Sequence, residues 1–397
     1  MMNLFIDIHC HPTIKHNLFG YSIFRESNGR KDNNYSNIQV TQPSLKRSGV
    51  NGVFASHYLP ERSILKDWRV VKKLDPLLKI FLRKYRKKVE KEYKAYQQTL
   101  QMISDFESLF TGQNEAVIVH SFKEMQEAIR LEKTFYVHVL EGAHHLGRNL
   151  PIEKYLKRIE ELKKTGIALI TLSHFYPNDI AYPTEGLTPL TKKRLRMQFV
   201  PKESVPLSKT GRMIVEKMLD MGIIIDLTHT NPTSRKEIYE INKLRLDKKR
   251  PLVFSHTGVR SLFKDLENPR FGLMAPDDEE ILEIKNCNGV IGIIFMNYWL
   301  SGREEKFPSR RDFGFKNMVN TIKHIHSITG SFDHIAIGTD FDGWADSPDD
   351  YYDSSMLGHF KIMLIRELGQ MGANEADVDK ITGGNILRVL EEGWDSI

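Results

Sequence analysis

Eight short runs rich in β-branched and apolar residues recur along this chain of 397 residues, and amphipathic stretches lie between most of them. The runs cover residues 4–8, 52–56, 135–140, 168–172, 223–227, 252–255, 290–295 and 334–338. Between them, residues 153–164 and 210–221 repeat apolar side chains every three or four positions, as a helix packed on a core does. Alternating strands and helices predict a parallel sheet. Eight strands predict a closed (β/α)₈ TIM barrel, with a doubly wound α/β sheet as the second choice.

The region between the second and third runs is too long for one barrel helix, and it carries most of the basic charge. Asp75 can cap a helix and Pro76 fits its first turn. Apolar residues then recur at helical spacing, so we expect an amphipathic helical insertion over residues 61–110. Residues 66–94 hold twelve Lys and Arg against four acidic residues, a balance of +8; the chain as a whole is +6, so the remainder is −2. We interpret the basic face as solvent-exposed, with a nucleic-acid or anionic-membrane surface as the alternative, and expect the apolar stripe to pack on the barrel or on a second subunit.

The length allows one large barrel or two to three smaller domains, and the strand pattern leads us to expect a single barrel over residues 1–397. No stretch approaches the ~18 apolar residues of a membrane span. The amino terminus lacks the basic region of a signal peptide, and the polar end E-E-G-W-D-S-I offers no membrane anchor. Two cysteines, Cys10 and Cys287, make no disulfide framework. We therefore expect a cytoplasmic protein without a membrane anchor.

Histidine or acidic side chains follow six of the eight predicted strands. The first strand runs into I-D-I-H-C-H-P, where His9 and His11 are two residues apart and so face the same side of a strand. The other positions are Glu141, His174, Asp226, His229, His256, Asp340 and Asp342. A single histidine after a strand is usually structural. Because the carboxyl ends of barrel strands converge, however, we expect these side chains to meet at one site.

Nitrogen and carboxylate donors in this number indicate a metal centre. They suit Zn²⁺, with Mn²⁺, Co²⁺ or Fe²⁺ as alternatives, and they exceed one tetrahedral ion, which predicts two divalent ions bridged by Glu141. Such ions would lower the pKa of a bridging water and polarise a carbonyl or phosphoryl oxygen, and Asp340 would carry the water's proton to the leaving amine. Asp226 instead bonds backbone or orients a histidine, and Asp342 is either a turn former or a ligand. These residues predict metal-assisted hydrolysis.

A series of sequence blocks surrounds these residues. In chain order they are I-D-I-H, V-L-E-G-A-H-H-L, L-I-T-L-S-H-F, G-L-T-P-L, L-S-K-T-G-R-M-I-V-E-K-M-L-D-M-G-I-I-I-D-L-T-H, V-F-S-H-T, N-P-R, G-V-I-G-I-I-F, I-A-I-G-T-D-F-D-G and I-T-G-G-N-I-L-R-V-L-E. These blocks resemble the membrane (renal) dipeptidase family, peptidase family M19 of the amidohydrolase superfamily. The resemblance covers residues 4–11 and 115–393 and little of 12–114.

The resemblance implies a role for each matched residue. Glu141 corresponds to the carboxylate that bridges two metals, His9 belongs with one ion, and His229 and His256 belong with the other. Asp340 resembles the aspartate that ligates or lies beside the first metal and acts as acid and base.

Two further residues match positions that contact the substrate in the family. His174 corresponds to the histidine that steadies the tetrahedral intermediate. Arg270, in N-P-R, corresponds to the arginine that grips the terminal carboxylate of the substrate, a role that suits a planar bidentate donor.

The chain departs from the family pattern at its first strand, where His-x-Asp of the family is His9-x-His11. As a ligand, His11 would replace a carboxylate with a neutral imidazole and make the first metal site one unit more positive. This change favours Zn²⁺ and makes the bound water more acidic. The insertion over residues 61–110 is a second departure.

We therefore expect a dinuclear metal-dependent hydrolase, a dipeptidase that cleaves the amide bond of a dipeptide or a similar small amide. The alternatives are hydrolysis of a lactone, a cyclic amide or an N-acyl amino acid, or a metal-binding barrel that has lost catalysis and serves as an interaction module. The expected partners are the small-molecule substrate and a second copy in a homodimer, with no nucleic acid.

Overall fold

The computed structural model describes residues 4–26, 38–61, 94–187, 192, 199–202, 204–263, 269–302, 314–343 and 347–394. Within these residues the strands form one sheet with parallel pairing throughout. The strands are β1 (Ile6–Cys10), β2 (Gly52–His57), β3 (Ala116–Val119), β4 (Thr134–Leu140), β5 (Leu169–Thr171), β6 (Ile224–Asp226), β7 (Leu252–Thr257), β8 (Val290–Ile293) and β9 (Ile335–Ile337).

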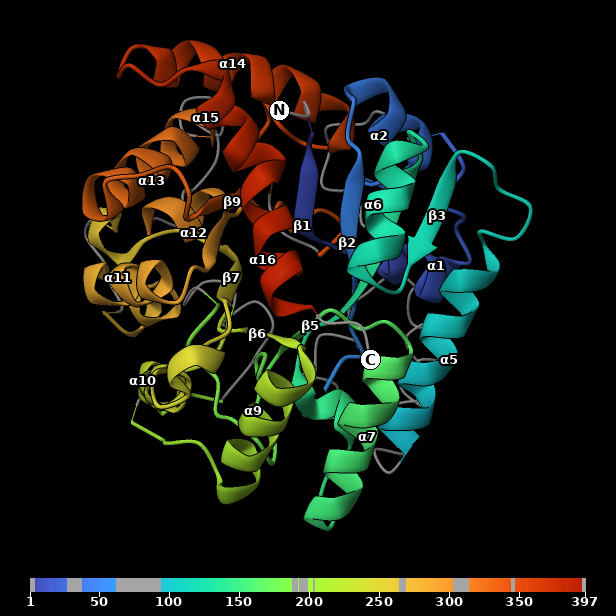
Figure 1. The fold of residues 1–397 in the computed structure, drawn as a ribbon, viewed down its shortest axis with the longest axis vertical. Helices are drawn as coiled ribbons and strands as arrows, with labels where there is room; N and C mark the ends of the chain where they lie inside the picture. The colour runs from blue at the N-terminus through green and yellow to red at the C-terminus, as the bar shows by residue number, and fades with distance from the viewer. Residues whose placement is uncertain are drawn as a thin grey trace.

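Eight of these strands close into a barrel, which Figure 1 shows with helices around it. Neighbouring strands follow the order β2, β1, β9, β8, β7, β6, β5, β4. The circle closes because β4 pairs with β2 along a ladder that runs from Gly52↔Phe135 to His57↔Leu140. The predicted (β/α)₈ barrel is therefore confirmed, with all eight predicted strands in it.

A ninth strand, β3, was not among the predicted runs. It pairs with β4 from Ala116↔Thr134 to Val119↔Val137, whereas β5 pairs with β4 only at Val139 and Leu140. β3 thus lies beside the amino-terminal part of β4, outside the closed circle. β3 is only four residues long and is stabilised by its pairing with β4. So short a run gives no clear periodic pattern in the sequence.

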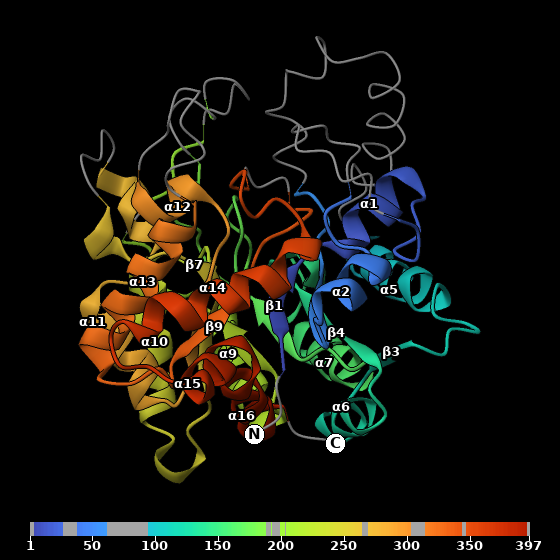
Figure 2. The ribbon, with the colours of Figure 1, turned by 90° about the horizontal axis from the view of Figure 1, so that it is seen from above.

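Helices cover the outside of the barrel (Figures 1 and 2). They are α1 (Pro12–Phe19), α2 (Gln42–Ser48), α5 (Ala95–Ser108), α6 (Phe122–Arg130), α7 (Ile152–Lys164), α9 (Lys209–Met221), α10 (Pro232–Lys243), α11 (Asp278–Asn286), α12 (Asn297–Ser301), α13 (Gly314–Thr329), α14 (Leu357–Gly369), α15 (Glu375–Asp379) and α16 (Asn385–Gly393). The predicted stretches 153–164 and 210–221 are α7 and α9. Figure 2 places α1 and α12, which follow β1 and β8, at one end of the barrel and α16 at the other. No helix among the described residues is long and apolar enough to cross a bilayer.

Side-chain caps mark where several helices begin. The Asn231 side chain accepts a hydrogen bond from the Ser234 amide, and Pro232 occupies the first turn of α10. Asp277 and Glu280 form a reciprocal capping box at the start of α11. Such caps satisfy amide groups that a first helical turn leaves unpaired, so local sequence determines where each helix leaves the preceding loop.

The predicted insertion over residues 61–110 is described in part. α5 packs on the barrel wall through Phe106, whose ring centroid lies 5.8 Å from that of His57 and 6.1 Å from that of Tyr136. The helix ends at Ser108, close to the predicted end at Phe110. Residues 62–93, with nearly all of the basic segment, lie outside the described residues, so the basic face stays a prediction.

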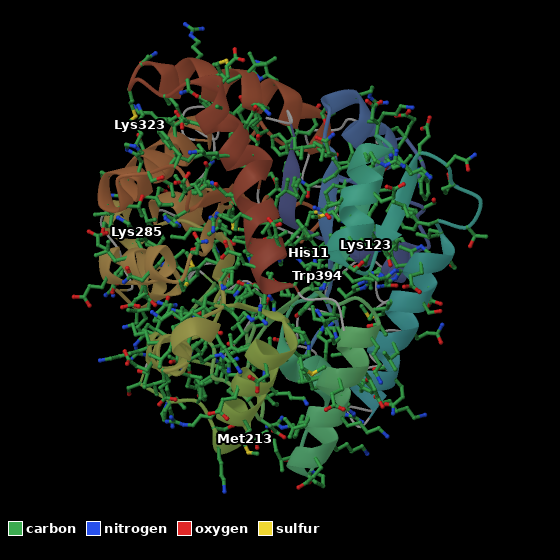
Figure 3. All side chains as sticks on the ribbon, viewed as in Figure 1. His11, Lys123, Met213, Lys285, Lys323 and Trp394 are labelled. Carbon is green, nitrogen blue, oxygen red and sulfur yellow. The ribbon has the colours of Figure 1, made fainter. Side chains whose placement is uncertain are left out.

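An apolar cluster fills the barrel and extends to its amino-terminal end. Ile6, Ile8 and Phe54 point into this cluster from β1 and β2. Val389 of α16 and Trp394 directly after that helix belong to the same cluster, and both are buried. Figure 3 shows Trp394 beside α16 near the centre of the view. α16 therefore covers the amino-terminal end, and the polar strand ends lie at the opposite one.

Candidate metal centre

His9 and His11 converge at the carboxyl end of β1. The pairing of β1 with β2 shifts register between Asp7 and Cys10, next to the two histidines. The Nε2 atoms of His9 and His11 lie 3.1 Å apart, and both residues are buried. The two imidazoles therefore meet in the way that their spacing in the sequence predicts.

Glu141 follows β4 and lies among five imidazoles. Its Oε2 atom is 3.5 Å from Nε2 of His11. Its Oε1 atom faces Nε2 of four more histidines: His9 at 3.5 Å, His174 at 3.7 Å, His229 at 3.3 Å and His256 at 3.6 Å. A carboxylate whose two oxygens face different imidazoles has the arrangement that a bridge between two ions requires.

His229 and His256 form a second pair, placed by the ends of β6 and β7. Their Nε2 atoms lie 3.2 Å apart. The backbone of His229 has φ +65°, in the left-handed region that residues other than glycine seldom adopt. Trp299 packs beside both rings, with centroid separations of 5.2 Å from His229 and 5.8 Å from His256. The turn and the indole together orient this pair towards Glu141.

Asp340 follows β9 and lies next to the first pair. Its Oδ1 atom is 3.2 Å from Nε2 of His11 and 3.9 Å from Nε2 of His9. Its backbone also has positive φ, +60°. At Gly343, an added Cβ would come within 2.1 Å of this Oδ1 atom, so the T-D-F-D-G turn needs a glycine there. The Asp340 side chain is 11% exposed, which leaves it access to a substrate.

His174 is held by Glu61, a residue that the sequence analysis did not identify. Oε1 of Glu61 lies 3.3 Å from Nδ1 of His174 and accepts the amide of Phe175 at 3.0 Å. The Tyr58 hydroxyl donates to Oε2 of Glu61 at 2.5 Å. Glu61 and His174 are 113 positions apart, so no local pattern could have indicated the contact.

Ser255 contacts two of the histidines at Nδ1, the nitrogen that does not face Glu141. Its Oγ atom lies 2.8 Å from Nδ1 of His256 and 3.2 Å from Nδ1 of His9, and it donates to Asp226 Oδ2 at 2.7 Å. Since Asp226 takes the hydroxyl proton, the oxygen of Ser255 is an acceptor for an Nδ1–H group. That tautomer leaves the Nε2 lone pair directed at Glu141.

Asp226 thus acts on the histidines through Ser255 and also anchors backbone. Its Oδ1 atom accepts the amides of Thr228 and Ser255, each at 3.0 Å. Both functions expected of this residue are present. Ser255 itself precedes His256 in V-F-S-H, and only its partners in the fold distinguish it from an ordinary buried serine.

Burial and neighbouring charges shift the pKa values of these groups in opposite directions. Burial holds the pKa of His256 well below its usual range, and burial also lowers the pKa of His229. For Glu141, burial raises the pKa, but the charges of His174 and His11 outweigh burial and keep that pKa well below its ordinary value. Neutral imidazole and ionised carboxylate are the forms that bind metal ions.

Two other predicted residues lie outside this cluster of imidazoles. Asp342 accepts the backbone amides of Gln39 and Val40, each at 3.0 Å, and has φ +62°, so it acts as the turn former. Arg270 is exposed in the 3₁₀ helix η6 (Pro269–Met274), and its role at a substrate carboxylate stays a prediction.

The donor set fits divalent metals. Three groups have one ligand atom from each member within 4.8 Å of one another: His9, His11 and Glu141; His9, His256 and Asp340; Glu141, His174 and His229. A tetrahedral zinc site with bonds of about 2.0–2.1 Å keeps its ligands about 3.4 Å apart. The separations of 3.1 and 3.2 Å within the two histidine pairs are close to this value.

Comparison with known protein families and structures also indicates a metal-dependent enzyme. A family described as membrane dipeptidase (peptidase family M19) matches residues 3–394. A dipeptidase of Clonostachys rogersoniana, verJ, is 24% identical over 361 residues, which are 89% of this chain and 76% of that protein. An uncharacterised dipeptidase of Schizosaccharomyces pombe is 27% identical over 75% of this chain, which spans 63% of that protein's length.

Among solved structures, a metallopeptidase from Rhodobacter sphaeroides liganded with a phosphinate mimic of the dipeptide L-Ala-D-Ala has the same fold. The match has a TM-score of 0.73 and 16% identity, and it covers 98% of this chain and 99% of that one. At this identity the likeness shows the shared barrel.

Proposed function

Since the chain belongs to the membrane dipeptidase family, peptidase family M19, we propose that it is a dinuclear metal-dependent dipeptidase that hydrolyses the amide bond of a dipeptide with a free carboxylate. The observation that carries this proposal is the position of Glu141 between two histidine pairs, with Nε2 atoms of both pairs 3.3–3.6 Å from its oxygens. One carboxylate between two such pairs suits two ions.

The residues proposed to hold the ions are His9, His11, Glu141, His229, His256 and Asp340. We propose Zn²⁺ as the resident ion because four imidazoles and two carboxylates favour a borderline metal; Mn²⁺, Co²⁺ and Fe²⁺ remain the alternatives. When bound, two such ions supply an acidified water and polarise the scissile carbonyl.

The protein's own groups would supply the proton transfers and orient the substrate. Asp340, at the exposed side of the cluster, would accept the proton of the attacking water and return it to the leaving amine. His174 would donate from Nε2 to the oxyanion that develops on the former carbonyl, while Glu61 fixes its Nδ1 atom. Arg270 would bind the substrate carboxylate through its guanidinium.

The runner-up reaction is hydrolysis of a lactone, a cyclic amide or an N-acyl amino acid, and the departure at His11 is what favours it. Arg270 discriminates between the two. If a dipeptide carboxylate binds there, Arg270→Lys should raise KM by about tenfold or more with a smaller change in kcat. An unchanged KM would show that Arg270 does not bind the carboxylate of a dipeptide.

The direct test is a panel of L,L-dipeptides, L,D-dipeptides and N-acyl amino acids, assayed with Zn²⁺ and with Mn²⁺. We expect turnover of dipeptides, loss of activity after chelation and recovery on adding metal back. Glu141→Gln should abolish both tight metal binding and turnover. A folded protein that hydrolyses no member of the panel under either metal would refute the dipeptidase assignment.

The homodimer and the cytoplasmic location stay proposals. Support for a reducing compartment comes from Cys10 and Cys287, which are both free thiols, with Cys10 buried.

A further inference from the structure

A second cluster of metal-ligand side chains lies outside the barrel, between α5 and the strands β3 and β4. It consists of Glu107 near the end of α5, His120 directly after β3, and His138 on β4. One ligand atom from each of these residues lies within 4.8 Å of the others. Figure 1 shows α5 and β3 on the same side of the molecule. None of these residues belongs to the proposed ligands around Glu141 or has a role in the proposed mechanism.

The distances within this cluster are those between ligands of one ion. Oε1 of Glu107 lies 3.0 Å from Nε2 of His120 and 3.3 Å from Nε2 of His138. Ligands in a tetrahedral zinc site are about 3.4 Å apart, because each bond is about 2.0–2.1 Å long. Two imidazole nitrogens and one carboxylate oxygen are a donor set that binds zinc and leaves a fourth position open.

Both imidazoles are oriented through their second nitrogen, as ligands of a built metal site usually are. Nδ1 of His138 lies 2.9 Å from Nε2 of His57, and these two residues are completely buried. Nδ1 of His120 lies 3.4 Å from Oε2 of Glu124, and the same Oε2 atom accepts the His120 amide at 2.9 Å. Each Nε2 atom is thereby turned towards Glu107.

The surroundings leave the cluster open on one side. The side chains of His120 and Glu107 are 40% and 39% exposed, whereas that of His138 is 0% exposed. An ion could therefore enter from solvent, and water could complete its coordination. The His120 backbone is also closely packed against Gly166, since a Cβ added at Gly166 would come within 2.7 Å of the Cα atom of His120.

We propose that Glu107, His120 and His138 form a third, peripheral zinc site, which fastens α5 to β3 and β4. α5 lies within the predicted insertion over residues 61–110, so this ion would connect the insertion to the barrel wall. The inference does not depend on dipeptidase activity, because the site lies on the outer face of the wall.

The test counts zinc on the full-length protein after chelator treatment, reloading with excess Zn²⁺ and desalting. The wild type is compared with Glu107→Gln and His120→Asn. We expect each variant to carry one equivalent fewer than the wild type while it keeps the wild-type activity. His324→Asn is the matched control, because His324 pairs with Asp278 at 2.7 Å far from this cluster, and it should keep the wild-type count.

Hydrogen exchange gives an independent measurement of whether the ion fastens α5 to β3 and β4. Adding Zn²⁺ should slow exchange of amides in α5 and β3 in the wild type but not in Glu107→Gln. Gln keeps the size and a hydrogen-bonding oxygen of Glu107, and His120 is exposed, so both variants are expected to fold. Equal zinc counts in the wild type and both variants would overturn the site, whatever number of ions the Glu141 cluster binds.

Discussion

The Glu61 carboxylate meets Nδ1 of His174 at 3.3 Å, while Nε2 of the same imidazole points to Glu141 at 3.7 Å. Glu61 thus determines which nitrogen of His174 is presented to the centre of the site. We expect Glu61→Gln to lower kcat by about 10–100-fold with a small change in KM, because positioning partners of site histidines have effects of this size. Steady-state kinetics on the best dipeptide measure this. Glu115→Gln is the control, because Glu115 is exposed and pairs with Lys46 at the surface. An unchanged kcat would show that Glu61 has only a structural role.

The same pair should make the stability of the metal-free protein depend on pH. Burial lowers the pKa of His174, but the charges of Glu141 and Glu61 outweigh burial and raise it above its ordinary 6.5. The stabilisation from His174 is therefore complete below pH 6.5 and is lost as the pH rises through the raised pKa. Burial raises the pKa of Glu61, but His174 more than offsets this and lowers it below 4.5, so the Glu61 contribution is present above pH 4.5.

Between pH 4.5 and pH 6.5 both the Glu61 and the His174 contributions to stability are present, so Glu61→Gln should be most destabilising in this range. We expect a loss of about 1–3 kcal/mol in the free energy of unfolding near pH 5.5, and a smaller loss as the pH rises towards 9, because His174 loses its proton as the pH passes its raised pKa. Denaturant unfolding of the chelator-treated protein at both pH values measures the difference. An equal loss at both would mean that the ion pair does not form.

Ser255 should control metal affinity without being a ligand. Ser255→Ala removes the acceptor for Nδ1–H of His9 and His256, and it removes one of the hydroxyl groups that donate to Asp226. We expect zinc affinity to fall about 10–100-fold, as for other partners of metal-binding histidines. Competition against a chelator of known affinity gives the change. Ser261→Ala, which removes a surface hydroxyl bonded to Asp278, should bind zinc like the wild type.

Restoring the family pattern at the first strand should change metal preference. His11→Asp replaces an imidazole by a carboxylate and makes the first proposed site one unit less positive. Carboxylate oxygen suits Mn²⁺ better than imidazole does, so the ratio of kcat/KM with Mn²⁺ to that with Zn²⁺ should rise. The number of bound ions should stay the same. A ratio that does not move would show that His11 is not a ligand.

The polar residues at the ends of the strands could be predicted from the sequence, because each one directly follows an apolar run and is recognised from its neighbours in the chain. His9 and His11, for example, are placed by two-residue periodicity, and barrel topology then brings them to Glu141. Glu61 could not be found in this way, since its partner is remote in the chain. Ser255 lies at a predicted strand end, but its role depends on Asp226, which comes from another strand.

Two histidines that the sequence analysis passed over lie on the outer face of the barrel wall. His138 occupies an apolar run and alternates with Val137 and Val139, which face the barrel interior. In a barrel, site residues are expected at the ends of strands, whereas His138 lies inside one. Its partner His120 follows β3, the strand that was missed, so the cluster around Glu107 could not be assembled from the sequence.

Trp394 and α16 cover the amino-terminal end of the barrel, opposite the metal centre. Among the described residues, the interior below the metal centre is a continuous cluster of buried apolar side chains. We therefore expect the substrate to enter and both products to leave at the carboxyl-terminal end of the strands. A free amino acid that has not yet left would occupy the place of the next dipeptide, so we expect the product to inhibit competitively.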